Sequence, residues 1–163
     1  MFPATIVVRH RKENLKKCSL RGLENRTDFL FFRYPLHEFL HPLENYILLS
    51  LDTSEELSHE DGAMGLLVLD ATWRYAQKME QQMAFPPSIR RRRLPGHLKT
   101  AYPRRQQDCL DPSQGLASVE AIACAYALMG RSLDGLLDHY HWKESFIEKN
   151  KCFLLNCVHA NNC

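Results

Sequence analysis

The sequence of 163 residues contains no apolar run that approaches the roughly 20 residues needed for a membrane-spanning helix. It also contains no internal repeat and no low-complexity segment. Its first short apolar stretch precedes the basic cluster Arg9-His10-Arg11-Lys12, whereas a secretory signal peptide has its basic residues before its apolar ones. These absences argue against a membrane, exported or repeat protein, and we expect a soluble, cytoplasmic one.

Paired cysteine spacing is missing as well. The six cysteines are Cys18, Cys109, Cys124, Cys152, Cys157 and Cys163. Without paired spacing or an export signal, reduced thiols are expected. Cys152, Cys157, His159 and Cys163 gather near the C-terminus, but their spacing matches no common zinc-ligand pattern. We therefore predict no metal site.

Lysine and arginine are absent from residues 36–70, which hold eight acidic residues, although the net charge of the chain is only +2. Residues 1–35 hold eight basic residues against three acidic ones, and residues 71–105 hold nine against one. Such segregation is typical of a protein that meets a polyanion with one face. Solvated charged loops are the alternative for any single run, but four consecutive arginines, Arg90 to Arg93, favour the polyanion.

The stretch Gly65 to Ala76 combines a predicted buried strand, an acidic residue and the start of a predicted helix. Leu66 to Leu69 form an apolar run without a polar break, which predicts a strand buried on both faces. Asp70 ends the run, Thr72 is a good helix cap, and Trp73 to Gln82 are good helix formers. A carboxylate between a strand and a helix lies where open α/β sheets bind ligands. The local pattern by itself favours a capping aspartate and a core tryptophan.

Three further apolar runs predict strands at Ala4–Val8, Asp28–Tyr34 and Ile47–Leu51. Because these runs do not alternate with polar residues, they indicate an α/β fold with a mostly parallel sheet. Between them, Ser19 is a candidate cap for one helix, and Thr53 for a short acidic one.

From Arg90 onward the pattern changes to loops and helices. A strong helix is predicted from Ser118 to Met129, ended by Gly130, and a second one from Ser132 to Lys149. We therefore expect an α/β N-terminal lobe over residues 1–92, a helical C-terminal lobe over residues 93–151, and a tail over residues 152–163.

The segment Asp70-Ala71-Thr72-Trp73 resembles the signature of the DTW-domain superfamily, the S-adenosylmethionine-dependent aminocarboxypropyltransferases that modify RNA. Four later motifs occur in the order of the branch that modifies small-subunit ribosomal RNA: Leu94-Pro95, Ala101-Tyr102-Pro103, Ser118-Val119-Glu120-Ala121 and Trp142-Lys143-Glu144-Ser145-Phe146. The resemblance covers about Lys16 to Asn150, and it is the order of the motifs that is specific. It implies that the C-terminal lobe completes the cofactor pocket and that the chain forms a SPOUT-like trefoil knot.

The resemblance also implies a reaction and a set of site residues. S-adenosylmethionine is the implied co-substrate, and its 3-amino-3-carboxypropyl group is transferred to N3 of a uridine or pseudouridine. Asp70 is implied to lie by the amino-acid moiety, as a base or as an orienting group, and Trp73 to line the pocket of the methionine side chain. The other implied cofactor contacts are Ser19, Val68, Leu94, Gln114 and Ser118.

For the partner, we expect small-subunit ribosomal RNA or a pre-ribosome, bound by a monomer. The predicted RNA face consists of Arg90, Arg91, Arg92, Arg93, Lys99, Arg104 and Arg105.

Several alternatives stay open from the sequence. Val68 and Leu94 can be core residues only, and Ser118 can be a helix cap with Glu120 in the first turn. The branch that modifies transfer RNA shares the acid–Thr–Trp motif. A knotted RNA methyltransferase uses the same cofactor, and a non-catalytic RNA-binding module in ribosome assembly needs only the basic segments.

Overall fold

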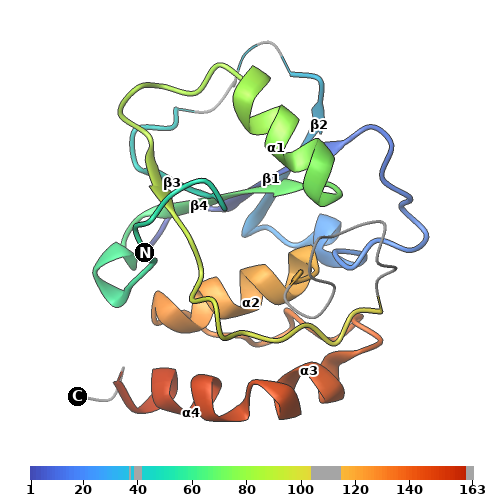
Figure 1. The fold of residues 1–163 in the computed structure, drawn as a ribbon, viewed down its shortest axis with the longest axis vertical. Coiled ribbons are helices and arrows are strands. Elements are labelled where there is room, and N and C mark those ends of the chain that lie inside the picture. Colours follow the sequence, from blue (N-terminus) through green and yellow to red (C-terminus); the bar gives the residue numbers. More distant parts are fainter. Residues whose placement is uncertain (37, 39–41, 104–114, 161–163) are drawn as a thin grey trace.

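The computed structural model describes residues 1–36, 38, 42–103 and 115–160, and in this part of the chain five parallel strands form one sheet in the order β2-β1-β4-β3-β5 (Figure 1). The strands are β1 (Thr5–His10), β2 (Phe29–Tyr34), β3 (Tyr46–Leu49), β4 (Gly65–Asp70) and β5 (Arg90–Arg92). The four predicted strands are confirmed, with ends that shift by one or two residues. The predicted α/β class with a parallel sheet is therefore correct.

The fifth strand departs from the prediction of loops from Arg90 onward. β5 is an edge strand that runs beside β3, with Arg90 at the register of Ile47 and Arg92 at that of Leu49. An edge strand needs one row of backbone hydrogen bonds and no burial on both faces, so charged side chains are common there. The apolar pattern that identifies the other four strands is therefore missing from β5.

Helices cover both faces of the sheet. They are α1 (Trp73–Gln82), α2 (Ser118–Leu128), α3 (Lys143–Lys149) and α4 (Lys151–Ala160), with 3₁₀ helices η1 (Leu23–Asn25) and η2 (His59–Asp61). α1 lies on one face of the sheet, and α2 on the other, with α3 and α4 outside α2 (Figure 1). Within the described residues, no helix is both long and apolar enough to cross a lipid bilayer.

Two hydrophobic cores fill the space between these layers. Val7 and Val68 belong to the core on the α2 side, whereas Ile6, Val8 and Leu67 belong to the core on the α1 side, as expected for strands whose side chains alternate between faces. Eight of the eleven residues of α2 are buried, because this helix lies between the sheet and the α3–α4 layer. Its alanines permit this close packing.

Two predicted helices are confirmed and one is corrected. α1 and α2 match the predictions to within one residue, and Gly130 follows α2 with a left-handed φ of 72°. The helix predicted from Ser132 to Lys149 is wrong in its first half: turns occupy 134–139, where Gly135 also has a φ of 72°, and only α3 is helical. A left-handed residue interrupts a right-handed helix.

Three other local expectations are also corrected. The segment predicted to be a tail continues as α4, which packs Phe153 against the α2-side core. Thr53 begins no helix, and the nearby η2 instead follows Ser58, whose backbone N–H donates to the Asp61 carboxylate at 3.1 Å. Ser19 lies in a series of turns before η1 and does not cap a helix of its own.

The strand order places the topological switch point of the sheet between β1 and β4. After β1 the chain passes through Leu20 and Leu23 on the α2 side and continues to β2. After β4 it passes through α1 and continues to β5, which lies on the far side of β3. In open α/β sheets, ligands bind at the carboxyl ends of two neighbouring parallel strands whose connections run in opposite directions. In this register Arg9 and Asp70 are direct neighbours.

Candidate functional site

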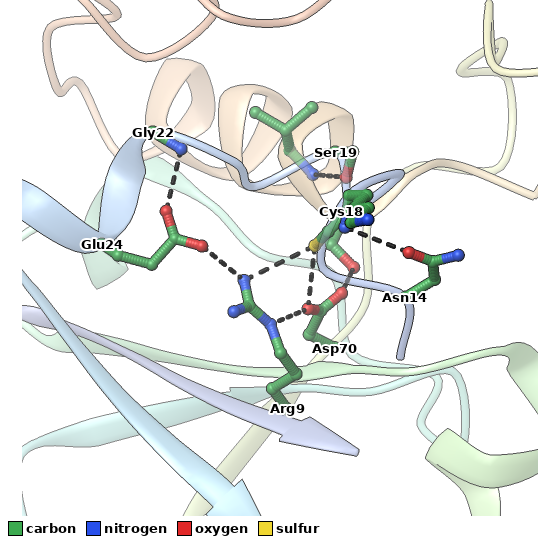
Figure 2. A network of polar contacts seen from close by, with 10 residues as sticks. Arg9, Asn14, Cys18, Ser19, Gly22, Glu24 and Asp70 are labelled. Atoms are coloured by element: carbon green, nitrogen blue, oxygen red, sulfur yellow. Dashed lines mark hydrogen bonds and ion pairs between the residues drawn. The ribbon is translucent and has the colours of Figure 1, made fainter. Parts of the chain in front are cut away.

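Asp70 lies at the centre of a polar network at this switch point (Figure 2). Its side chain is almost fully buried and accepts hydrogen bonds from three side chains. Arg9 Nε donates to Oδ2 at 2.9 Å, the Cys18 thiol donates to Oδ2 at 3.4 Å, and the Ser118 hydroxyl donates to Oδ1 at 2.7 Å. The carboxylate thus faces α2 and not α1, whose N-cap residue is Thr72. The capping role that the local pattern favours for Asp70 is wrong.

Arg9 is the cationic partner of Asp70, and no motif in the sequence singles it out. Its guanidinium also donates to Glu24 Oε1 at 3.2 Å (Figure 2). The same guanidinium lies 4.9 Å from the centroid of the Phe31 ring. Burial opposes the charged form of Arg9, but the hydrogen bond and the charge of Asp70 outweigh burial and raise its pKa above the ordinary value. The only sequence signal for Arg9 is its place after an apolar run, and the pairing with Asp70 depends on strand order.

Cys18 contributes a neutral thiol to the network. Burial, followed by the negative charge of Asp70, raises the pKa of Cys18 to about 12. The thiol therefore stays protonated at physiological pH and serves as a hydrogen-bond donor to Asp70. A nucleophilic cysteine needs the opposite shift.

The two predicted serines meet at the start of α2. Ser118 is the first residue of this helix, but its hydroxyl is directed to Asp70 and not to the helix backbone. The Ser19 hydroxyl accepts from the backbone N–H of Val119 at 3.2 Å, so a residue 100 positions earlier satisfies the helix start (Figure 2). The cap interpretation of Ser118 is therefore corrected, and Ser19 caps a distant helix.

Glu120 is fully buried behind the network and accepts four hydrogen bonds. The donors are the Thr100 hydroxyl at 2.7 Å, the Ala101 N–H at 2.8 Å, the Ala117 N–H at 2.9 Å and the Tyr140 hydroxyl at 2.8 Å. The Glu120 carboxylate therefore connects Thr100 and Ala101 to the start of α2 through hydrogen bonds. The expectation that Glu120 is simply a first-turn acid missed this role, which depends on contacts distant in sequence.

The remaining predicted cofactor residues lie around the end of β4. Val68 is buried in the core, and β4 pairs with β3 only as far as Leu67, so the following backbone has no strand partner on that side among the described residues. Trp73 is half-buried at the start of α1, and Leu94 is half-buried against the α2-side core. Gln114 lies outside the described residues. The structure thus joins Ser19, Asp70 and Ser118 at the start of α2.

Three arginines of the predicted RNA face form ion pairs with acidic side chains of the protein. Arg91 Nε lies 3.0 Å from Glu80, Arg92 Nε lies 3.2 Å from Asp61, and Arg93 Nη2 lies 3.2 Å from Glu56. These pairs attach β5 to the acidic segment before β4 and to α1, so their charge is largely neutralised within the protein. Arg90 and Lys99 are exposed, and Arg104 and Arg105 lie outside the described residues. The ion pairs give Arg91, Arg92 and Arg93 a structural role, and their part in the predicted RNA face stays a prediction.

The site has the chemistry of an organic-ligand site. It offers a carboxylate, a guanidinium and two hydroxyls at the carboxyl edge of a parallel sheet. In the part of the chain that the structure describes, no group of three or more His, Cys, Asp or Glu residues is arranged to hold a metal ion. This combination can bind a ligand that carries both an ammonium and a carboxylate group.

Comparisons with known proteins find a solved structure of similar fold. No protein-family model and no curated protein sequence matches the chain. The structure of the SAM-dependent rRNA:acp-transferase Tsr3 from Vulcanisaeta distributa superimposes with a TM-score of 0.75 and 22% sequence identity, covering 98% of this chain and 85% of that one. The protein is therefore similar to Tsr3 in fold over nearly its whole length.

Proposed function

We propose that the protein is an S-adenosylmethionine-dependent aminocarboxypropyltransferase that modifies a uridine or pseudouridine of small-subunit ribosomal RNA. The observation that carries this proposal is the Asp70 network, at the switch point of a sheet whose fold resembles that of an rRNA:acp-transferase. The DTW-like motif around Asp70 and the ordered motifs after it support the same activity.

The residues of the network fit S-adenosylmethionine by charge. The amino-acid end of this molecule carries an ammonium and a carboxylate, and Asp70 and Arg9 offer the two opposite charges side by side. Trp73 is assigned to the methionine side chain, Ser19 and Ser118 to the nucleoside, and Val68 and Leu94 to backbone contacts. Gln114 is a further proposed contact.

S-adenosylmethionine supplies the transferred group: as a base nitrogen bonds to its Cγ, the Cγ–S bond breaks, the electron pair stays on sulfur in methylthioadenosine, and the nitrogen loses its proton. Both oxygens of Asp70 are already engaged by donors. This arrangement supports Asp70 as the group that orients the amino-acid end, rather than as the base that removes the proton.

The resemblance also supports two architectural proposals. One is a deep trefoil knot in the chain around the cofactor pocket. The other is the division into a lobe of residues 1–92 and a lobe of residues 93–151 that together enclose this pocket. Limited proteolysis between the lobes, with and without S-adenosylmethionine, tests the second proposal, because a shared pocket predicts protection by the ligand.

Nucleoside mass spectrometry of RNA from cells with and without the gene tests the proposed activity. We expect loss of an aminocarboxypropyl-modified uridine or pseudouridine from small-subunit ribosomal RNA. Loss from transfer RNA instead assigns the protein to the other branch, and loss of a methyl group from a base identifies a methyltransferase. Unchanged nucleosides in both RNAs favour the non-catalytic module.

Trp73→Ala tests the cofactor pocket. Loss of the indole should weaken S-adenosylmethionine binding by roughly 1–3 kcal/mol, because apolar contact around the methionine side chain is removed. Isothermal titration calorimetry measures this change. Trp142→Ala is the matched control, since Trp142 is also partly exposed but precedes α3, outside α2. Equal affinities for the two variants would remove Trp73 from the pocket.

A further inference from the structure

A cavity of about 250 Å³ opens where β1 and β2 end. Its lining residues come from these two strands and from the loop after β1: Arg9, His10, Arg11, Glu13, Leu15, Phe31, Phe32 and Arg33. Arg9 belongs both to this cavity and to the Asp70 network, so the two adjoin. The cavity is smaller than the about 300–1,000 Å³ of pockets for drug-sized ligands. Its volume lies below that range, which argues against a whole S-adenosylmethionine molecule as its occupant.

The cavity carries an excess of positive charge. Three arginines and one carboxylate, Glu13, are among the described residues that line it. Arg9 and Arg33 occupy the same register on neighbouring strands, where like charges oppose one another. Arg9 is compensated by ion pairs with acidic side chains of the network, whereas none of the ion pairs among the described residues involves Arg11 or Arg33. Arg11 and Arg33 are exposed, so an anion bound in the cavity would offset the repulsion between the charges of Arg9 and Arg33.

The other walls of the cavity are apolar or aromatic. Phe31 and Phe32 are half-buried, and Leu15 is 58% exposed on the loop after β1. His10 is buried, and its pKa lies below the ordinary value because of burial and then because of the nearby charges of Arg11 and Lys12. A neutral aromatic wall beside exposed cations suits a planar base attached to a phosphate.

We propose that this cavity binds an unpaired nucleotide of the RNA substrate, with Arg11 and Arg33 on its phosphates and the apolar wall against its base. The choice of RNA over other polyanions rests on the proposed function. The shared residue Arg9 places this nucleotide next to Asp70. The exposed cations of the cavity contrast with Arg91, Arg92 and Arg93, which are already paired with acidic residues.

Fluorescence anisotropy of the full chain with a labelled single-stranded oligouridylate tests the proposal. Arg11→Ala/Arg33→Ala should bind roughly tenfold more weakly, and the log–log salt dependence should become shallower by about 0.7 for each phosphate that the variant no longer neutralises. Lys78→Ala/Lys151→Ala removes the same charge from exposed positions on α1 and α4, and we expect it to match the wild type. Equal reductions in affinity in both double variants would show a general charge effect and overturn the proposal.

Two further arms locate and identify the binding site. Arg90→Ala/Lys99→Ala removes the exposed cations of the face predicted from sequence, and a larger reduction in affinity there than in Arg11→Ala/Arg33→Ala would overturn the cavity assignment. Inorganic polyphosphate serves as a competitor for the wild type. If it displaces the RNA as well as unlabelled oligouridylate does at equal phosphate, the cavity recognises phosphate without a base and the nucleotide assignment is wrong.

The outcome is separable from that of the proposed function, because RNA binding is measured without S-adenosylmethionine. Normal RNA affinity in Arg11→Ala/Arg33→Ala, together with normal transfer, would overturn the cavity assignment and leave the enzyme proposal standing. Loss of RNA affinity in this variant, with no transfer by the wild type, would support the cavity and end the enzyme proposal. Equal melting temperatures show that these exposed substitutions leave the fold intact.

Discussion

Asp70→Asn should lower the single-turnover rate of aminocarboxypropyl transfer by about 10²–10⁴-fold, the range expected when a positioned catalytic group is removed or misplaced. The asparagine oxygen can still accept from Ser118, but its amide nitrogen is a donor that would face Arg9 and Cys18, which are donors themselves. The negative charge that orients the amino-acid end is lost, and Arg9 keeps only Glu24 as an ionic partner among the described residues.

The melting temperature of the same preparation separates this effect from loss of fold. We expect a stability loss of about 1–3 kcal/mol, because the half-buried guanidinium of Arg9 loses its closest carboxylate. Asp28→Asn is the matched control. The Asp28 carboxylate pairs with Arg26 at 2.7 Å just before β2, at the amino end of that strand, whereas Asp70 lies at the carboxyl end of β4. A near-normal transfer rate in Asp70→Asn would end the catalytic assignment, and an equal rate loss in Asp28→Asn would trace the effect to stability.

Glu120→Ala should lower the free energy of unfolding by roughly 3–5 kcal/mol, because four donors lose their acceptor in a buried site. Each buried donor that loses its acceptor usually costs about 1–3 kcal/mol of stability. Relaxation of the segment that contains Thr100 lowers the total for the four donors. Urea unfolding followed by circular dichroism measures the change.

Two variants keep this second prediction decisive. Glu148→Ala removes an exposed glutamate from α3 and should stay within about 0.5 kcal/mol of the wild type. Glu120→Gln retains one acceptor oxygen and should lie between the alanine variant and the wild type, and it remains measurable if the alanine variant does not fold. A loss below about 1 kcal/mol in Glu120→Ala would show that these hydrogen bonds contribute little to the stability of the α2 junction.

The site was only partly accessible from the sequence. Asp70 was singled out by the resemblance of Asp70-Ala71-Thr72-Trp73 to a family signature, since the local pattern by itself favours a capping aspartate. Arg9 was not singled out, since its partner lies on a strand 61 residues later and the two meet only in the observed strand order. The role of Ser19 at α2 is non-local in the same way, as are the pairings of Arg91 with α1 and of Arg92 and Arg93 with the acidic segment.

The sequence by itself determined the strands β1, β2, β3 and β4 and the helices α1 and α2, because uninterrupted apolar runs and good helix formers act over neighbouring residues. Tertiary structure decided the edge strand β5, the turns around Gly135 and the helix α4, each of which depends on what lies beside it. It also decided which carboxyl ends are neighbours. That placement, and not any local pattern, brings Arg9 to Asp70 and the cavity of Arg11 and Arg33 to the edge of the site.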